Sequence, residues 1–195
     1  MIVWAILASR PSIPEQDATR YAKALQVEAK IHNFDPLTGV AIIQQESGFD
    51  PASVSPDGED FGLGQIRARY VGPCRQDGDP VQNPSAECQA VKQSLLDPEV
   101  NIRAMAELIA TNRQFCKKKT GSAFFHQWLA SYQGRNFPVK RRWCKAGDKT
   151  WTVIRYRERL LKELARRQSL DLARARGSPS PGARSTLSVS ARLRN

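Results

Sequence analysis

The sequence predicts a mainly α fold built around one domain, and three observations support this. Apolar residues recur every three or four positions in several segments, which is the spacing of one buried helix face. The chain has 195 residues and 41% hydrophobic residues, enough for a single domain that buries a core. Three glycines between residues 58 and 64 predict a loop beside one of these helices.

The expected helices follow one another with short connections. In chain order they cover residues 15–31, 36–47, 85–96, 98–115, 122–132 and 150–167. The apolar stripes of three of them are Tyr21, Ala22, Leu25 and Ala29, then Ile102, Met105, Ala106 and Ile109, then Ile154, Leu160, Leu161 and Leu164. We interpret these stripes as core residues without a functional role.

The folded domain is expected over residues 15–167, with a segment on either side. Residues 2–9 are a short apolar run without a preceding basic residue. We favour the remnant of a signal peptide that starts upstream, and the alternative is a strand or extended segment packed on the domain. Residues 168–195 are rich in Arg, Ser, Pro and Gly, so we expect a basic, disordered tail. No stretch approaches the roughly 20 apolar residues of a membrane span, so an integral membrane protein is not expected.

Glu46 is the strongest candidate for a catalytic acid, because it ends an apolar helix. Ile42 and Ile43 precede it by four and three residues and share its face. A helix C-terminus carries partial negative charge and normally attracts cations. Burial and the helix dipole should therefore both raise the Glu46 pKa, as a general acid near neutral pH requires.

The glycine-rich loop strengthens this interpretation. Gly62 and Gly64 flank Leu63, and Gln65 follows with a neutral amide suited to hydroxyls and amides. A lone Glu would be interpreted as a helix end followed by a solvated loop. Here the acid, the glycine after it and the Gly-Leu-Gly-Gln turn occur together.

These motifs resemble those of the soluble lytic transglycosylases, which cleave peptidoglycan. Residues 46–51 are Glu-Ser-Gly-Phe-Asp-Pro, and residues 62–66 are Gly-Leu-Gly-Gln-Ile. Residues 97–102 resemble the Asp-Pro-x-x-Asn-Ile helix start of that family, and residues 128–134 resemble its Ala-Tyr-Asn-x-Gly segment. The resemblance covers roughly residues 20–160. Three departures are Gln133 in place of Asn, Gly64 in place of Met, and an insert between Cys74 and Cys88.

The resemblance implies a lysozyme-like helical domain with the glycine-rich loop beside the catalytic helix. It also implies that Glu46 acts first as acid and then as base on the bond between N-acetylmuramic acid and N-acetylglucosamine. The product is a 1,6-anhydromuramoyl end. The residues expected to bind the glycan are Ser47, Leu63, Gln65, Tyr132 and Gln133. Ser47 has a simpler alternative role at the helix end, and Tyr132 has one as a core ring. No metal or other cofactor is expected.

Two other functions stay open on the sequence alone. The first is a hydrolytic muramidase of lysozyme type, in which a loop acid positions water as the second carboxylate. The candidates for that carboxylate are Asp50, Asp57, Glu59 and Asp60. The second is a wall-binding or assembly protein without catalytic activity. Intact Glu46, Ser47 and Gln65 argue against it.

The four cysteines are expected to form disulfides. No Cys-x-x-Cys spacing occurs and the chain has two histidines, so a zinc site is not expected. Of the three pairings, we favour Cys74–Cys88 with Cys116–Cys144, because the first pair brackets a segment rich in Gly, Pro, Asp and Asn. The alternative is four reduced cysteines in the cytosol. Disulfides favour the periplasm, the cell envelope or secretion.

Positive charge is concentrated in the second half of the chain. Residues 1–115 carry 10 Lys and Arg against 15 Asp and Glu, whereas residues 116–195 carry 20 against 4. The basic runs 117–119 and 140–142 lack interleaved aromatic residues, so nucleic acid is a weaker expectation than the anionic cell envelope. Besides peptidoglycan glycan strands, we expect a surface for an envelope-spanning partner, such as a secretion or conjugation machine.

Overall fold

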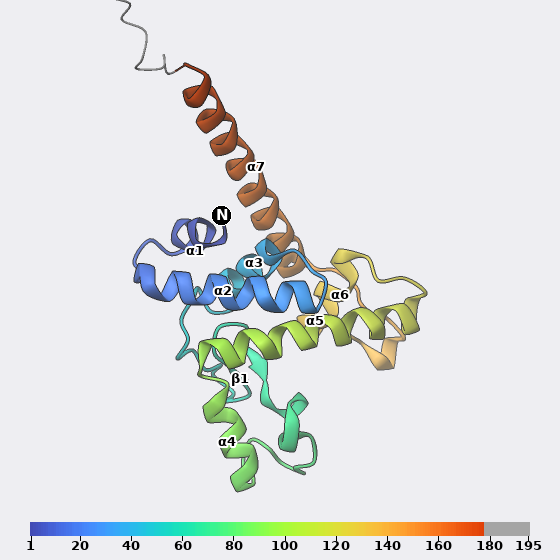
Figure 1. Ribbon diagram of the computed structural model, residues 1–195. Helices are drawn as coiled ribbons and strands as arrows, with labels where there is room; N and C mark the ends of the chain where they lie inside the picture. Colours follow the sequence, from blue (N-terminus) through green and yellow to red (C-terminus); the bar gives the residue numbers. More distant parts are fainter. Residues whose placement is uncertain (178–195) are drawn as a thin grey trace, which may run out of the picture. The chain divides into compact units, whose positions relative to one another are not determined.

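The protein is mainly α-helical, as predicted (Figure 1). The computed structural model describes residues 1–177. In chain order, the elements are α1 (Ile2–Ser9), α2 (Glu15–Ile31), α3 (Pro36–Glu46), β1 (Asp60–Phe61), β2 (Ile66–Arg67), α4 (Ala86–Ser94), α5 (Pro98–Thr120), α6 (Phe125–Tyr132) and α7 (Asp148–Gly177). Short 3₁₀ turns lie at η1 (Ala68–Tyr70), η2 (Gly72–Arg75) and η3 (Pro138–Lys140). None of the helices in the described part is long and apolar enough to cross a bilayer.

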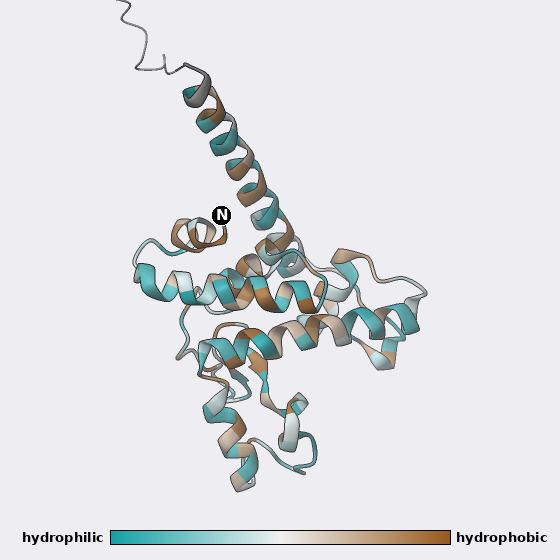
Figure 2. Cartoon of the chain, viewed as in Figure 1, coloured by the Kyte–Doolittle hydropathy of each residue, from teal (hydrophilic) through white to brown (hydrophobic). Residues whose placement is uncertain are grey.

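The chain divides into two compact units, Met1–Leu161 and the residues from Lys162 onward. In the first unit α2 lies beside α5, and α6 packs against α5 (Figure 1). Leu25, Ile42 and Met105 are fully buried side chains of this core. Figure 2 shows that α1 is apolar along most of its length, whereas α2 alternates apolar and polar residues, as expected for a helix with one buried face.

Side-chain caps fix where several helices begin. Asp35 accepts a hydrogen bond from the backbone N–H of Leu37 at 3.1 Å, and Pro36 follows as the first helical residue of α3. Asp97 accepts from the N–H groups of Glu99 and Val100 in the same way at the start of α5. An Asp cap followed by Pro is a strong helix-start signal, because it satisfies donors that lack intrahelical partners. The helix α3 ends at Glu46, with Ser47 as its C-cap.

The first and last helices of the described chain differ from the elements expected for those segments. Residues 2–9 form a helix rather than a strand or extended segment, and Ile2 and Ile6 are buried where α1 packs on α2 and α3. The last helix continues to Gly177, so the expected disorder of residues 168–177 is wrong. Leu, Ala and Arg dominate that stretch and favour helix, and no Pro or Gly interrupts it before Gly177. The rest of the expected tail, 178–195, lies outside the described residues.

The helix α5 is also longer than predicted. It was expected to end at residue 115 but continues to Thr120, and Gly121 follows in the left-handed conformation with φ 76°. Lys117, Lys118 and Lys119 occupy its last turn, where cations interact favourably with the helix dipole. The extension places Cys116 inside the helix and facing the core.

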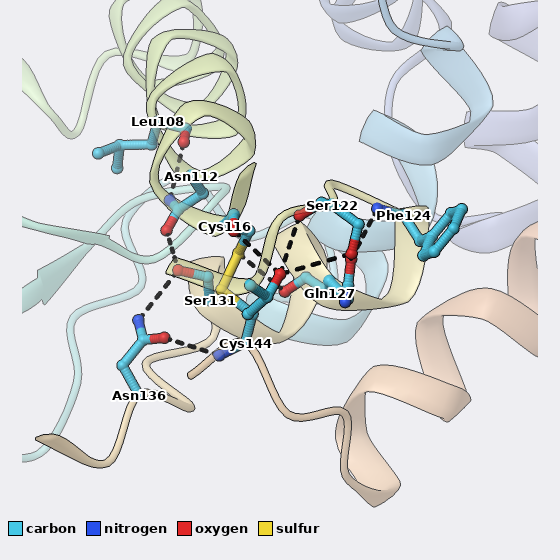
Figure 3. Close-up of a disulfide and its surroundings, with 10 residues drawn as sticks. Leu108, Asn112, Cys116, Ser122, Phe124, Gln127, Ser131, Asn136 and Cys144 are labelled. Atoms are coloured by element: carbon cyan, nitrogen blue, oxygen red, sulfur yellow. Dashed lines mark hydrogen bonds between the residues drawn. A yellow bond between two sulfur atoms is a disulfide. The ribbon is translucent and has the colours of Figure 1, made fainter. Parts of the chain in front are cut away.

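Both disulfides of the favoured pairing are present. Cys74 and Cys88 join η2 to α4, and Cys116 and Cys144 join α5 to the segment that precedes α7. All four cysteines are buried. The second bond and its neighbours are drawn in Figure 3.

Candidate active site

The Glu46 carboxyl occupies a partly buried position at the C-terminal end of α3. Burial raises the pKa of Glu46 above its ordinary value, and the nearby Asp60 charge acts in the same direction. The hydrogen bond from Gln133 and the charge of Lys149 oppose this by lowering the pKa. The net upward direction confirms the sequence-based expectation, and it keeps a larger protonated fraction available near neutral pH.

A chain of hydrogen bonds links Glu46 to the start of α7. Gln133 Nε2 donates to Glu46 Oε1 at 3.2 Å, and Thr150 Oγ1 donates to Gln133 Oε1 at 2.9 Å. Thr150 is fully buried and accepts in turn from the backbone N–H of Gly147 at 3.3 Å. Because Thr150 donates to the amide oxygen, the Gln133 amide nitrogen must face Glu46. Gln133 was expected to bind the glycan, and in this structure it holds the acid.

Ser47 joins the end of α3 to the glycine-rich loop. Its hydroxyl donates to the carbonyl oxygen of Leu63 at 2.8 Å. Leu63 itself has no exposed surface, so a glycan cannot touch it in this conformation. Its carbonyl oxygen connects the loop to the end of α3. Leu63 was expected to bind the glycan directly, and the structure instead gives it this internal role.

Gln65 and Tyr132 also hold the loop in shape. Gln65 Nε2 donates to the carbonyl oxygens of Ser53 and Gly62 at 3.1 and 3.0 Å. The Tyr132 hydroxyl donates to the carbonyl oxygen of Gly64 at 2.7 Å. Burial, followed by the charges of Glu46 and Asp60, raises the pKa of Tyr132 well above its usual range, so the hydroxyl keeps its proton. Both side chains lie at the loop expected for them, and their polar groups already have protein partners.

Asn101 attaches the loop to α5. Its side chain is fully buried, accepts from Gly64 N–H at 2.7 Å and donates to the carbonyl oxygens of Phe61 and Leu95 at 2.8 and 2.7 Å. Gly62, at φ 68°, passes so close that an added Cβ would lie 2.3 Å from the Leu95 carbonyl oxygen. A glycine is therefore required here both by conformation and by space.

Replacing Gly62 by Ala is expected to destabilise the domain by about 2–4 kcal/mol, because strain and a backbone clash combine. Gly58 offers a matched control, since its φ is 71° but nothing lies within 4 Å of an added Cβ. Gly58→Ala should cost only the conformational strain of about 1–2 kcal/mol. Denaturant unfolding of both variants tests this, and equal losses would contradict the close approach.

Three of the four loop carboxylates named above are paired with arginines. Asp60 receives two hydrogen bonds of 2.9 Å from Arg67, and Glu59 lies 3.1 Å from another nitrogen of the same guanidinium. Glu59 also contacts Arg69, and Asp57 lies 3.5 Å from Arg67. Glu46 has no arginine or lysine partner of this kind among the described residues. Asp57, Glu59 and Asp60 are thus held in ion pairs, whereas Asp50 is exposed and accepts a hydrogen bond from the backbone N–H of Ala52 at 3.0 Å.

Hydrogen bonds beside the Cys116–Cys144 disulfide position the helix that carries Tyr132 (Figure 3). The Ser131 hydroxyl donates to Asn112 Oδ1 on α5 and accepts from Asn136 Nδ2. Asn136 Oδ1 accepts from the backbone N–H of Cys144 at 3.1 Å. Side chains of α5, α6 and the following segment are therefore connected through buried or half-buried groups. Gln133 is two residues from Ser131, so this network supports its placement.

Sequence reasoning missed two residues that shape the site. Thr150 was assigned to the start of a helix without a role, and its contact with Gln133 depends on packing that local sequence does not encode. Asn101 was recognised only as part of the helix-start motif at residues 97–102. That motif was the sequence signal that could have singled it out, but its hydrogen bond to the glycine-rich loop was not predicted. Among the described residues, no cluster of His, Cys, Asp and Glu is arranged to hold a metal ion.

Comparison with known proteins agrees with this geometry. A family model described as the transglycosylase SLT domain matches residues 23–150, which include the catalytic helix, the glycine-rich loop, α5 and α6. No curated protein and no solved structure matches the chain significantly. The matched region covers well over half of the chain. The chain therefore belongs to the transglycosylase SLT domain family, the lytic transglycosylases with a lysozyme-like fold.

Proposed function

We propose that the protein cleaves peptidoglycan as a lytic transglycosylase, with Glu46 as its single acid and base. The family supports glycosidic-bond cleavage in peptidoglycan in general. The observation that carries the finer proposal is the contrast between Glu46 and its neighbours. Glu46 has a raised pKa and no strong cationic partner, whereas Asp60 and Glu59 are neutralised by Arg67.

The proposed reaction needs one proton donor and no water. The protonated Glu46 gives its proton to the glycosidic oxygen between N-acetylmuramic acid and N-acetylglucosamine as the C1–O bond breaks. The resulting carboxylate then takes the proton of the muramoyl C6 hydroxyl, and that oxygen bonds to C1. The products are a free 4-hydroxyl on N-acetylglucosamine and a 1,6-anhydromuramoyl end, so Glu46 returns to its starting form.

In this proposal Gln133 decides which oxygen of Glu46 carries the proton. Its amide N–H already donates to Oε1, so Oε1 must remain an acceptor. The proton then resides on Oε2, which is the oxygen left for the substrate. Thr150 maintains this arrangement, because its own donor is committed to the Gln133 amide oxygen.

Thr150→Val is expected to lower kcat by about tenfold while changing KM little, because the lost hydroxyl oriented a group that acts on the acid. Gln133 could then turn its amide and withdraw the hydrogen bond that lowers the Glu46 pKa. The basic limb of the pH–rate profile should move to higher pH, and Thr150→Ser should restore both properties. An unchanged pH profile in Thr150→Val would contradict the positioning role.

The experiment that tests the proposed function is mass spectrometry of muropeptides released from purified peptidoglycan. Wild type should give products lighter by one water than hydrolytic products, without a reducing end. Glu46→Gln should give none. Reducing-end products would establish a hydrolase and redirect attention to Asp57 and Asp60. No products from either protein would favour a wall-binding role without catalysis.

We also propose that the protein works outside the cytoplasm, in the periplasm, in the cell envelope or after secretion. Its substrate class lies there, and two disulfides need an oxidising compartment. An envelope-spanning partner stays a prediction from the charge of the second half of the chain.

A further inference from the structure

A cavity lies where the end of α5, the start of α6 and the start of α7 meet, and Glu46 is not among its lining residues. Its volume is about 620 Å³. The lining residues are Lys119, Thr120, His126, Gln127, Arg141, Arg142, Trp143, Cys144, Lys145, Ala146 and Trp151. We propose that this basic–aromatic pocket binds a muramoyl sugar together with the carboxylates of its attached peptide, and that it holds the enzyme on the polymer.

The charge of the pocket suits carboxylates. Lys119, Arg141, Arg142 and Lys145 are exposed, and none of the lining residues, all within the described part of the chain, is acidic. Arginine binds a carboxylate through two parallel hydrogen bonds, and lysine adds a mobile positive charge. Muramoyl residues carry peptides that end in carboxylates, so each repeat of the glycan offers such groups.

The aromatic rings supply the second half of the recognition. Trp151 is 42% exposed and stacks on His126 with ring centroids 5.7 Å apart. Lys119 lies over the Trp143 ring at 4.6 Å from its centroid. A partly exposed indole beside a lysine that lies over a second indole fits a ligand with an apolar face and neighbouring carboxylates. An N-acetylated sugar ring whose attached peptide carries carboxylates has this character.

The position of the pocket favours a polymer that also occupies the site of Glu46. Thr150 belongs to the hydrogen-bond chain of Glu46, and Trp151, the next residue on α7, lines the pocket. Residues 150 and 151 are adjacent in the chain, with Cα atoms about 3.8 Å apart, so the pocket begins next to the residue that ends the hydrogen-bond chain of Glu46. Two contacts on one strand raise the effective affinity without either being strong. The inference rests in this respect on the proposed function.

The rival ligand for such a surface is nucleic acid, since bases stack on aromatic rings and phosphates bind cations. Trp143 directly follows the basic run 140–142 in sequence, and the fold brings Trp151 and His126 into the same pocket. Peptidoglycan is favoured because all lining residues except Trp151 lie within residues 23–150, the region that matches a peptidoglycan-cleaving domain.

The experiment is a sedimentation assay with insoluble peptidoglycan in a Glu46→Gln background, so that the polymer is not consumed. Trp151→Ala and Arg141→Glu/Arg142→Glu should each weaken binding by about tenfold. Lys23→Glu/Lys30→Glu on α2 changes the net charge by the same amount at an exposed surface and should leave binding within about twofold. Circular dichroism melting confirms that each variant folds.

Three further measurements distinguish binding at the pocket from general charge effects, loss of catalysis and binding of nucleic acid. Peptidoglycan whose carboxylates have been converted to amides should bind the parent protein about tenfold more weakly, as the pocket variants bind the untreated polymer. With Glu46 restored, the pocket variants should cleave short soluble glycan fragments at normal rates. Equal losses in the pocket and α2 variants, or Trp151-dependent binding of single-stranded DNA that exceeds binding to peptidoglycan, would overturn the pocket proposal. Pocket-dependent binding by a wild type that yields no cleavage products would instead overturn only the proposed function.

Discussion

Glu46→Gln should lower kcat/KM on peptidoglycan by about 10³-fold or more, because it removes the only proton donor that the proposed reaction uses. The measurement is the release of soluble fragments from purified peptidoglycan at saturating and limiting substrate. Glu107→Gln is the matched control, since Glu107 is an exposed acid on α5 outside the site. It should retain full activity. A Glu46→Gln protein with more than a few per cent of wild-type activity would contradict the assignment.

Glu46→Gln should also make the folded protein more stable at neutral pH. The pKa of Glu46 is raised in the folded state, chiefly by burial, so folding disfavours the ionised form. This cost is absent below the ordinary pKa of a glutamate and develops as the pH rises through the raised pKa. Glu46→Gln should therefore melt higher than wild type at pH 7 and at a similar temperature in acid. A lower melting temperature at pH 7 would mean that the carboxylate is stabilised instead.

The second large effect is expected from loss of the Cys116–Cys144 disulfide. Cys116→Ser/Cys144→Ser opens a link between residues that are 28 apart in sequence. Chain entropy assigns such a loop about 3–4 kcal/mol of folding free energy. Activity should fall as well, even well below the melting temperature. The reason is that this bond holds the segment leading to Thr150, which orients Gln133 toward Glu46.

The variant Cys74→Ser/Cys88→Ser separates the loss of stability from the loss of activity. That bond closes a span of 14 residues between η2 and α4, so its removal should cost about 3 kcal/mol. It carries none of the residues in the hydrogen-bond chain of Glu46, so the folded variant should keep its activity. Thermal unfolding and initial rates at a temperature where every variant is folded provide the comparison. Equal loss of activity in both double variants would contradict the specific role of Cys116–Cys144.

Local signals were sufficient for the catalytic helix. Pro36 after Asp35 marks its start, Gly48 follows its end, and Ile42 and Ile43 place Glu46 on an apolar face. Each of these is a contact or preference within a few residues, which a sequence pattern can represent. The raised pKa of Glu46 was predictable for the same reason, although burial alone now accounts for most of it.

Contacts between distant segments could not be predicted in this way. Gln133 and Glu46 are 87 residues apart in sequence, and Thr150 reaches Gln133 only because α7 begins beside the end of α6. The basic–aromatic pocket likewise combines three separate segments. The N-terminal helix was missed for a different reason. An apolar run of eight residues is compatible with a strand and with a helix, and the packing of α1 on α2 and α3 favours the helix.

The central claim is that a single carboxyl group cleaves the glycan without water, and digestion in H₂¹⁸O tests it most directly. Hydrolysis places a solvent oxygen on C1 of the muramoyl end, whereas closure by the C6 hydroxyl uses an oxygen already in the sugar. We expect products that lack ¹⁸O and are lighter by one water than hydrolytic products. Muramoyl ends that carry ¹⁸O from the first turnovers would contradict the claim and identify the protein as a hydrolase.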